Sequence, residues 1–244
     1  MTGRDLLPAE LIKIRTLPAI WIALAVACVA NTLLGIVAAT DAVRIAGPDG
    51  PAPITEHGTL MLAPVYAFAA VAVFAAGSEY RGGQLRISLL AAPDRDRLFA
   101  AKLAASAAVC LPTAVAALLP GHVARYAGAV ADGRLGIGRV AVDLVALVAV
   151  YLLVGLIGHG FAIAARTVVT PLVALFGTPV LVAPILRAVL PEPVAFLPHE
   201  AALSLLGVPA DPAALGRAAG LLVLTGWAVL FLGTAWALFT RRDG

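Results

Sequence analysis

The chain has 244 residues, of which 61% are hydrophobic and 13% charged, and its formal net charge at pH 7 is +3. Its mean hydropathy of +0.99 is far above that of a soluble domain, because only about half of the residues of soluble domains are apolar. The composition therefore excludes a water-soluble globular domain and indicates an integral membrane protein.

Six apolar stretches without charges recur along the chain. Each is about 20 residues long or slightly longer, which is the length that crosses a hydrocarbon core of roughly 30 Å as a helix. Because the stretches are continuously apolar and too long for barrel strands, we predict an all-α fold. The prediction is a single six-helix transmembrane domain over residues 1–244, with spans at about 18–40, 58–78, 97–124, 142–165, 167–189 and 217–240.

The basic residues indicate how these spans are oriented. Six spans place both termini on one side, and eleven of the 17 basic residues fall on that side: Arg4, Lys13, Arg15, Arg81, Arg86, Arg95, Arg97, Lys102, Arg166, Arg241 and Arg242. Because positively charged loops stay inside, we predict a multi-pass plasma-membrane protein with both termini cytoplasmic. Anionic lipid accounts for the pI of about 9.2, so no nucleic-acid partner is expected.

An amphipathic segment precedes the first span. Leucine and isoleucine recur there at helical spacing, while Glu10 and Lys13 share another face. We predict that residues 5–16 form a helix in the cytoplasmic interface, with Lys13 and Arg15 anchored at lipid headgroups. A basic flank that only sets the topology is the alternative.

A long charged loop joins the second and third spans, from Ser78 to Lys102. It holds a Gly-Gly break, a short apolar run and a Pro-Asp pair. Asp94 of that pair is a good N-cap for the third span. Arg97 and Lys102, which begin that span, are predicted to reach lipid headgroups as interfacial anchors.

Prolines interrupt the later part of the chain. Kinks are expected in the third and fifth spans, at Pro112, Pro120, Pro171, Pro179 and Pro184. The segment 191–216 is too apolar for a solvated loop and too broken by proline for a span. We therefore predict a short re-entrant or interfacial helix at 199–206, between the fifth and sixth spans.

Sequence motifs for catalysis are missing. Neither Lys13 nor Lys102 follows a glycine, so the chain has no P-loop for ATP. His199 and Glu200 begin like a zinc-protease helix, but Leu203 stands where that motif requires a second histidine. We expect no enzymatic activity of the chain itself, no metal site and no cofactor.

The predicted spans also lack the carboxylates that ion-coupled transporters use. Their candidate path-lining residues are Asn31 and His159, and a hydrogen bond to a neighbouring helix is the alternative role for His159. Energy for any transport would therefore come from another polypeptide.

The loop after the second span carries a family pattern. It reads Glu79, Tyr80, Arg81, Gly82, Gly83, Gln84, Leu85, Arg86, then Leu89, Leu90, Ala91, Ala92 and Pro93, with Arg97 and Lys102 behind. This order resembles the membrane subunits of ABC-2 type exporters, especially the compact permeases of high-GC actinobacteria. The segments ELIKIRT and FLPHEAALSLL are similar to the family's N-terminal helix and to its element between the fifth and sixth spans. Gly83 and Gln84 replace the threonine that is common in the family.

The resemblance implies a permease subunit of an ATP-driven exporter. A second permease subunit, as a homo- or heterodimer, would complete the translocation path, and a separate cytoplasmic ABC ATPase would supply the energy. Residues 84–91 would be a coupling helix within the 79–97 loop, with Leu85 and Leu89 as its apolar edge and Arg81 and Arg86 facing acidic groups. The coupling residues are thus Glu79, Arg81, Gly82, Gly83, Leu85, Arg86, Leu89 and Pro93.

Two points stay open at this stage. The alternation of Leu85, Ile87 and Leu89 also fits a strand, so the helix follows from the resemblance, as does the expectation that Glu79 forms a salt bridge within the loop. The alternative function is a non-transporting membrane anchor or sensor subunit that docks a cytoplasmic partner through the same loop. A third reading, an intramembrane enzyme, has no motif in its support.

Overall fold

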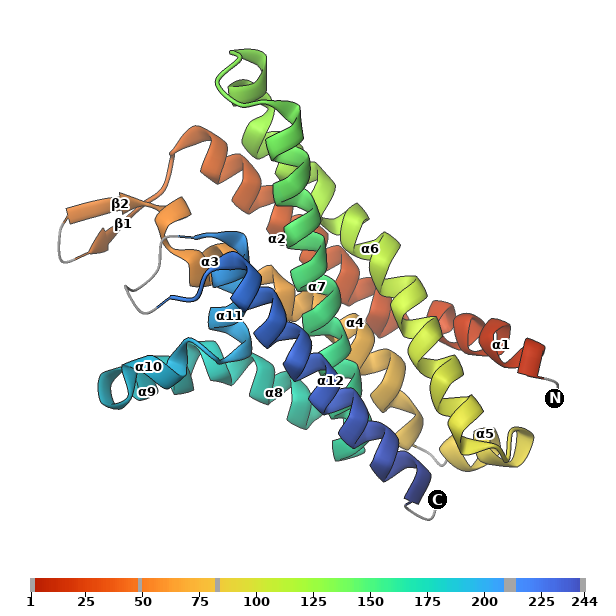
Figure 1. The fold of residues 1–244 in the computed structure, drawn as a ribbon. Helices are drawn as coiled ribbons and strands as arrows, with labels where there is room; N and C mark the ends of the chain where they lie inside the picture. Colours follow the sequence, from red (N-terminus) through yellow and green to blue (C-terminus); the bar gives the residue numbers. More distant parts are fainter. Residues whose placement is uncertain (1–2, 48–49, 82–83, 209–213, 242–244) are drawn as a thin grey trace.

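A computed structural model of the chain describes residues 3–47, 50–81, 84–208 and 214–241 (Figure 1). Its helices are α1 (Gly3–Thr16), α2 (Pro18–Thr40), α3 (Gly58–Leu62), α4 (Pro64–Gly77), α5 (Gln84–Ala91), α6 (Arg95–Ala131), α7 (Ile137–Ala165), α8 (Val169–Gly177), α9 (Ala183–Val189), α10 (Pro191–Val194), α11 (Pro198–Leu206) and α12 (Arg217–Arg241). Short turns η1 (Ile54–Glu56), η2 (Ser78–Tyr80) and η3 (Thr178–Val182), the last a π-helix, extend or join them. Strands β1 (Arg44–Gly47) and β2 (Gly50–Pro53) pair antiparallel.

Six helical segments in the described part of the chain are long and apolar enough to cross a membrane. They are Pro18–Thr40, Gly58–Tyr80, Arg95–Ala131, Ile137–Ala165, Val169–Val189 and Arg217–Arg241. By length and composition these six helices are consistent with the predicted all-α, multi-pass membrane protein. The third and fourth segments continue beyond their predicted ends, and their extensions form the hairpin that projects from the bundle in Figure 1.

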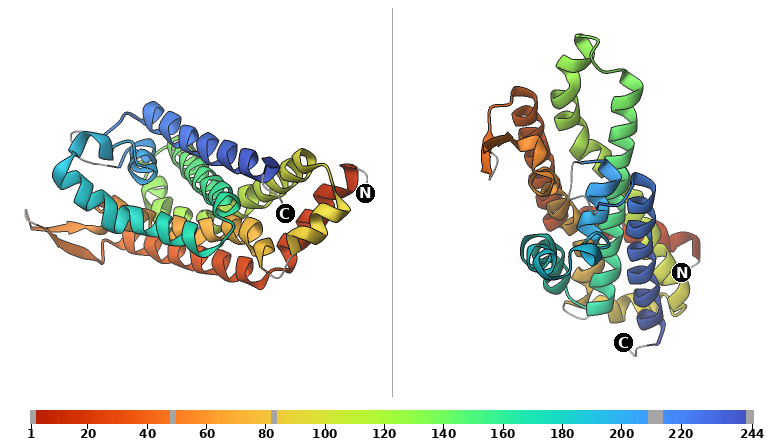
Figure 2. Two further views of the ribbon diagram at one scale, coloured as in Figure 1. Left: turned by 90° about the horizontal axis from the view of Figure 1, so that it is seen from below. Right: turned by 60° about the vertical axis from the view of Figure 1, so that its left-hand side comes forward.

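Helix α4 lies at the centre of this bundle (Figure 2). In the most apolar 18 residues of its spanning segment 61% are buried, against 17% in the matching stretches of α12 and of α8 to α9. Its neighbour α2 turns small residues such as Ala23 and Ala27 inward and exposes Ile22, Val26 and Val29. An outward apolar stripe on a long helix is what contact with lipid requires, because lipid rather than water covers it.

Two helix crossings depend on glycine. A methyl group at Gly35 of α2 would fall on the carbonyl oxygen of Gly121 in α6, and one at Gly121 would fall on the Asn31 backbone. Gly160 of α7 packs in the same way on the backbone of Phe231 in α12. Small residues of this kind let spanning helices approach closely.

Three shorter elements confirm predicted helices. Helix α1 covers the predicted 5–16 segment, α5 has the predicted bounds of 84–91, and α11 covers 199–206. Residues 199 to 205 of α11 are all buried, so this helix is inserted among the others rather than lying on the bundle surface. The membrane depth of α1 and α11 stays a prediction.

The prolines act differently in the two predicted kinked spans. Helix α6 continues through Pro112 and Pro120 as one α-helix. The fifth span is divided instead: α8 ends at Gly177, the π-helical turn η3 contains Pro179, and α9 begins at Ala183. A π-turn is a known way to accommodate a lost helical hydrogen bond.

Helices α1 and α5 and the last turn of α12 lie at one end of the bundle, which we name the termini end (Figures 1 and 2). The β1–β2 pair, α11 and the α6–α7 hairpin lie toward the other end, the far end. This division places two different polar regions at opposite ends of the bundle.

Candidate functional site

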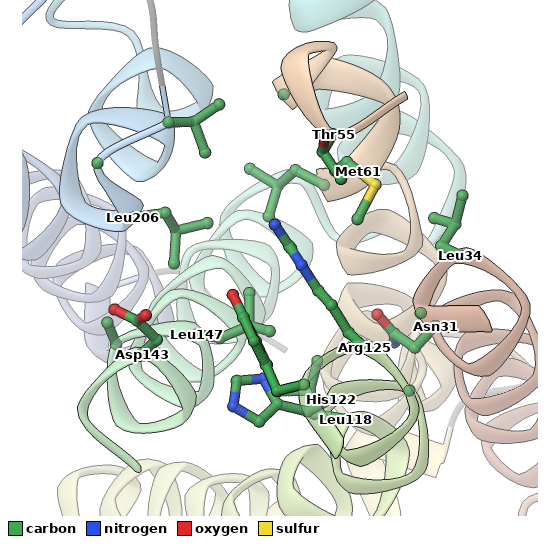
Figure 3. Close-up of a pocket in the computed structure, with 18 of the residues that line it drawn as sticks. Asn31, Leu34, Thr55, Met61, Leu118, His122, Arg125, Asp143, Leu147 and Leu206 are labelled. Atoms are coloured by element: carbon green, nitrogen blue, oxygen red, sulfur yellow. The ribbon is translucent and has the colours of Figure 1, made fainter. Parts of the chain in front are cut away.

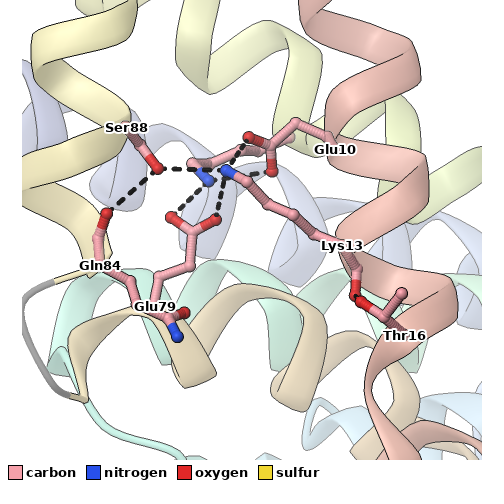
Figure 4. Close-up of polar contacts among 7 residues, drawn as sticks. Glu10, Lys13, Thr16, Glu79, Gln84 and Ser88 are labelled. Atoms are coloured by element: carbon pink, nitrogen blue, oxygen red, sulfur yellow. Dashed lines mark hydrogen bonds and ion pairs between the residues drawn. The ribbon is translucent and has the colours of Figure 1, made fainter.

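A closed ring of four charged side chains occupies the termini end (Figure 4). Lys13 Nζ lies 2.7 Å from Glu10 Oε1 and 3.1 Å from Glu79 Oε1. Lys102 Nζ lies 3.0 Å from Glu10 Oε2 and 2.5 Å from Glu79 Oε2. Each lysine therefore bridges both carboxylates, and the two positive charges balance the two negative ones. We name these four residues the ion ring.

Three separate elements bring these side chains together. Glu10 and Lys13 share a face of α1, because residues three apart in a helix are neighbours. Glu79 follows α4 in the turn η2, and Lys102 is in the second turn of α6. The ring thus joins the first helix of the chain to the second and third spanning helices.

Burial makes the balance of charge necessary. Glu10 and Glu79 are each 5% exposed and Lys102 is 6% exposed. Removing one partner of a buried pair leaves a charge without compensation, which costs far more than a surface salt bridge is worth. The carboxylates raise the pKa of Lys13 above its ordinary value, since their hydrogen bonds and charges outweigh the lowering by burial.

The structure corrects one anchor assignment. The prediction that Lys102 reaches lipid headgroups is wrong, because two carboxylates hold its ammonium inside the protein. Lys13, the second predicted anchor in the ring, is only half-exposed and also turns to the carboxylates. Arg15 and Arg97 are exposed, and Arg97 also pairs with Asp94 at 2.9 Å. Their contact with lipid stays a prediction.

Glu79 is an exception to the prediction that the spans lack carboxylates. The predicted second span ends at Ser78, whereas the helical segment continues to Tyr80 and includes Glu79. The expected salt bridge of Glu79 within the Ser78–Lys102 loop is confirmed by its pair with Lys102. The additional partner Lys13, in the N-terminal helix, was not predicted.

Helix α5 is tied to the ion ring by one side chain. Lys13 Nζ donates to Ser88 Oγ at 3.1 Å, and that hydroxyl donates to the Gln84 carbonyl at 3.2 Å (Figure 4). Asp94 caps the next helix by accepting from the Arg97 backbone N–H at 3.1 Å, which confirms the predicted N-cap. The loop is therefore held at the middle of α5 by Ser88 and at the start of α6 by Asp94.

The apolar edge of α5 differs from the predicted one. Leu85 and Leu89 turn inward and pack against the buried cluster that contains Phe99 and Ile163. Ile87 and Leu90 point outward and are 69% and 86% exposed. The prediction that Leu85 and Leu89 form the free edge is wrong, because a helix this close to the bundle buries the face that contacts it.

The remaining coupling residues divide into two groups. Arg81, Arg86 and Pro93 are exposed at the termini end. Gly82 and Gly83 lie outside the described residues. Whether any of these residues contacts a partner stays a prediction.

The two candidate path-lining residues have different surroundings. Asn31 lines a cavity at the far end, where its Oδ1 accepts from Tyr151 Oη at 2.8 Å and its Nδ2 donates to the Ala27 carbonyl at 2.8 Å. His159 is 1% exposed and enclosed against α4, with the Ala72 backbone beside its ring. Neither of its ring nitrogens makes a well-formed hydrogen bond among the described residues. The structure thus shows His159 as a packed core residue.

Comparison with known proteins gives no further information about this site. Neither a comparison with protein-family models nor one with curated proteins finds a match for the chain. Within the described residues, no group of three or more His, Cys, Asp or Glu side chains is placed to hold a metal ion. The chain's own geometry is therefore the basis for proposing a function.

Proposed function

We propose that this chain is the membrane-spanning permease subunit of an ATP-driven ABC exporter of the ABC-2 type. Its spans would form part of the translocation path, and its 79–97 loop would couple them to a separate cytoplasmic ATPase. The observation that carries this proposal is α5, an eight-residue helix at the termini end whose outward Ile87 and Leu90 are exposed. The termini end is then the cytoplasmic side of the plasma membrane.

The exposed edge of α5 suits a groove on another protein. Ile87 and Leu90 are one helical turn apart, so they can enter one apolar groove together. Arg81 and Arg86 are exposed near this edge and could pair with acidic side chains around such a groove. Arginine suits this role because its planar head binds carboxylates with two hydrogen bonds.

The ion ring offers a route from α5 to the spanning helices. A force on α5 would act through Ser88 on Lys13, and through the carboxylates of Glu10 and Glu79 on Lys102 in α6. Buried ion pairs hold discrete arrangements, because each charge must keep a partner. Motion of the ATPase would therefore shift α1 and α6 together. A second permease subunit, identical or different, would supply the other half of the path.

Co-purification tests this proposal. The tagged chain is expressed in its native host, extracted in mild detergent and analysed by mass spectrometry. We expect a P-loop ATPase in stoichiometric amount with the unmodified chain. In the variant Leu90→Asp we expect its amount to fall by about tenfold or more, because an apolar anchor at the centre of an interface contributes roughly 2 kcal/mol or more.

A matched control places the same substitution elsewhere. Val43→Asp changes an exposed apolar residue of the loop before β1, at the far end, and should leave the ATPase bound. The proposal is refuted if the unmodified chain brings no ATPase, or if Leu90→Asp retains it fully. A stoichiometric partner of another kind would instead identify a membrane anchor or sensor subunit.

A further inference from the structure

A cavity of about 290 Å³ opens at the far end of the bundle, away from the ion ring. Helices α2, α6, α7, α11 and α12 contribute to its wall. In Figure 3, Arg125 extends from α6 across the middle of the cavity, while Asp143 and Leu147 lie together on α7 and Asn31 lies on another side. The cavity is thus large enough for part of a ligand and carries both polar and apolar groups.

Its charges do not balance. Three arginines line the cavity, Arg125, Arg139 and Arg217, together with one carboxylate, Asp143. The Asp143 carboxylate is shared, at 3.5 Å from Arg139 Nε and 3.6 Å from Arg217 Nη1. Among the described residues that line the cavity, the three arginines therefore exceed the one carboxylate by two positive charges.

Arg125 is the arginine that lacks a carboxylate. It is half-buried, and among the residues that the structure describes no acidic side chain pairs with it; its guanidinium lies 5.1 Å from the centre of the Tyr126 ring instead. A guanidinium cannot lose its charge at any physiological pH. Its fork of N–H donors fits the oxygen atoms of a phosphate or carboxylate group.

The polar and apolar parts of the cavity are layered. Arg125, Arg139 and Asp143 lie at the predicted outer ends of the third and fourth spans, where headgroups meet water. Leu118 and Leu147 line the cavity one to two helical turns further into those spans. A charged rim over an apolar floor fits a ligand with an anionic group and an apolar tail.

We propose that this cavity binds an anionic amphipath, with its phosphate group on Arg125 and its tail on the apolar floor. Arg217 and Arg139 would contact the phosphate at the expense of their shared pair with Asp143. The cavity is separate from the coupling surface on α5. The proposed ligand binding therefore does not depend on whether an ATPase binds α5. Two sources share this chemistry, a resident membrane phospholipid and an amphipath that the protein transports.

Ligand binding by the purified full chain tests the site. The chain is labelled with a fluorophore on a C-terminal tag, kept in dodecyl maltoside and titrated with dioctanoyl phosphatidylglycerol. Dioctanoyl phosphatidylcholine has the same tails without net charge, and inorganic phosphate has no tail. Thermophoresis gives the Kd of each, and we expect only phosphatidylglycerol to bind tightly.

Charge variants assign the contact. We expect Arg125→Gln to weaken phosphatidylglycerol binding by roughly tenfold to a hundredfold, the factor that a lost charge-assisted hydrogen bond produces, and Arg125→Lys to weaken it less. Asp143→Asn should strengthen binding, because it releases Arg139 and Arg217. The matched control is Arg134→Gln, which removes the same charge from an exposed pair with Asp132 outside the cavity.

The outcomes separate clearly. The site is overturned if Arg125→Gln binds like the unmodified chain, if Arg134→Gln loses as much affinity, or if phosphatidylcholine binds equally well. Displacement by inorganic phosphate at equal concentration would overturn recognition of an amphipath.

Mass spectrometry of the purified chain then identifies the source of the ligand. A phospholipid retained at one per chain is a resident lipid, and a site filled only on addition binds an exchangeable ligand. Either result supports the proposal.

Discussion

The ammonium of Lys102 in α6 lies 2.5 Å from the carboxylate of Glu79 at the end of α4, and both side chains are almost completely buried. We expect Lys102→Met to lower the free energy of unfolding by about 3–5 kcal/mol, because it leaves two carboxylates with one lysine in a buried site. Chemical denaturation of the detergent-solubilised chain measures this loss. Arg97→Gln breaks an exposed pair at the start of the same helix and should cost less than about 1 kcal/mol. Equal losses would contradict the assigned role of burial.

The contact between Lys13 and Ser88 predicts local control of α5. Ser88→Ala removes the hydroxyl that Lys13 contacts, which should weaken α5 docking by about 1 kcal/mol and speed its amide hydrogen exchange by roughly fivefold. Exchange measured by mass spectrometry over peptides 84–94 tests this. Thr16→Ala is the control, because its hydroxyl bonds only the Lys13 backbone at the exposed end of α1. Unchanged exchange in Ser88→Ala would show that α5 is held by Leu85 and Leu89 alone.

Glycine substitutions in α6 should have opposite effects at two positions. Gly121→Ala places a methyl group on the backbone of α2, and we expect it to destabilise the fold by about 1–3 kcal/mol through overpacking. Gly128→Ala, two turns further along the same helix, meets open space. It should be neutral or stabilising by up to about 1 kcal/mol, since alanine favours helix. Thermal unfolding monitored by circular dichroism compares the two, and the same sign for both would contradict the close crossing.

The pKa of Lys13 predicts how stability changes in alkali. Its pKa in the folded protein is raised above the ordinary value of 10.5, so the folded state holds this proton more tightly than the unfolded state. Its contribution is therefore complete below pH 10.5 and is lost as the pH rises through the folded pKa. Unfolding midpoints of the unmodified chain and of Lys13→Met, measured from pH 8 to 11.5, should converge at the alkaline end (roughly one unit above the ordinary lysine pKa). A constant difference across this range would refute the prediction.

Local patterns were sufficient for the spanning helices, for α1 and for the start of α6. Uncharged length predicted the six spans, helical spacing predicted α1, and the Pro-Asp pair predicted the start of α6. The bounds of α5 came from a family resemblance. Which face of α5 turns inward could not be predicted, since helical spacing groups Leu85 with Leu89 without showing what they contact.

The ion ring was missed for a different reason. Glu10 and Lys102 are 92 residues apart, and no local pattern relates them. The available signal was Glu79, a carboxylate that follows a long uncharged stretch and therefore requires a positive partner nearby. Arg125 gave a similar signal at the end of the third span, but its position over a cavity depends on the packing of several helices.

The length of α6 has a consequence for how the protein sits in a membrane. Its 37 residues extend about 55 Å at 1.5 Å per residue, whereas a hydrocarbon core is only about 30 Å thick. If α6 spans the bilayer at an ordinary tilt, part of it must lie outside the hydrocarbon core, and we expect the excess at the turn between α6 and α7. A protease site inserted beside Gly133 would be cut from one side of a sealed vesicle only, which makes this hairpin a direct marker of orientation.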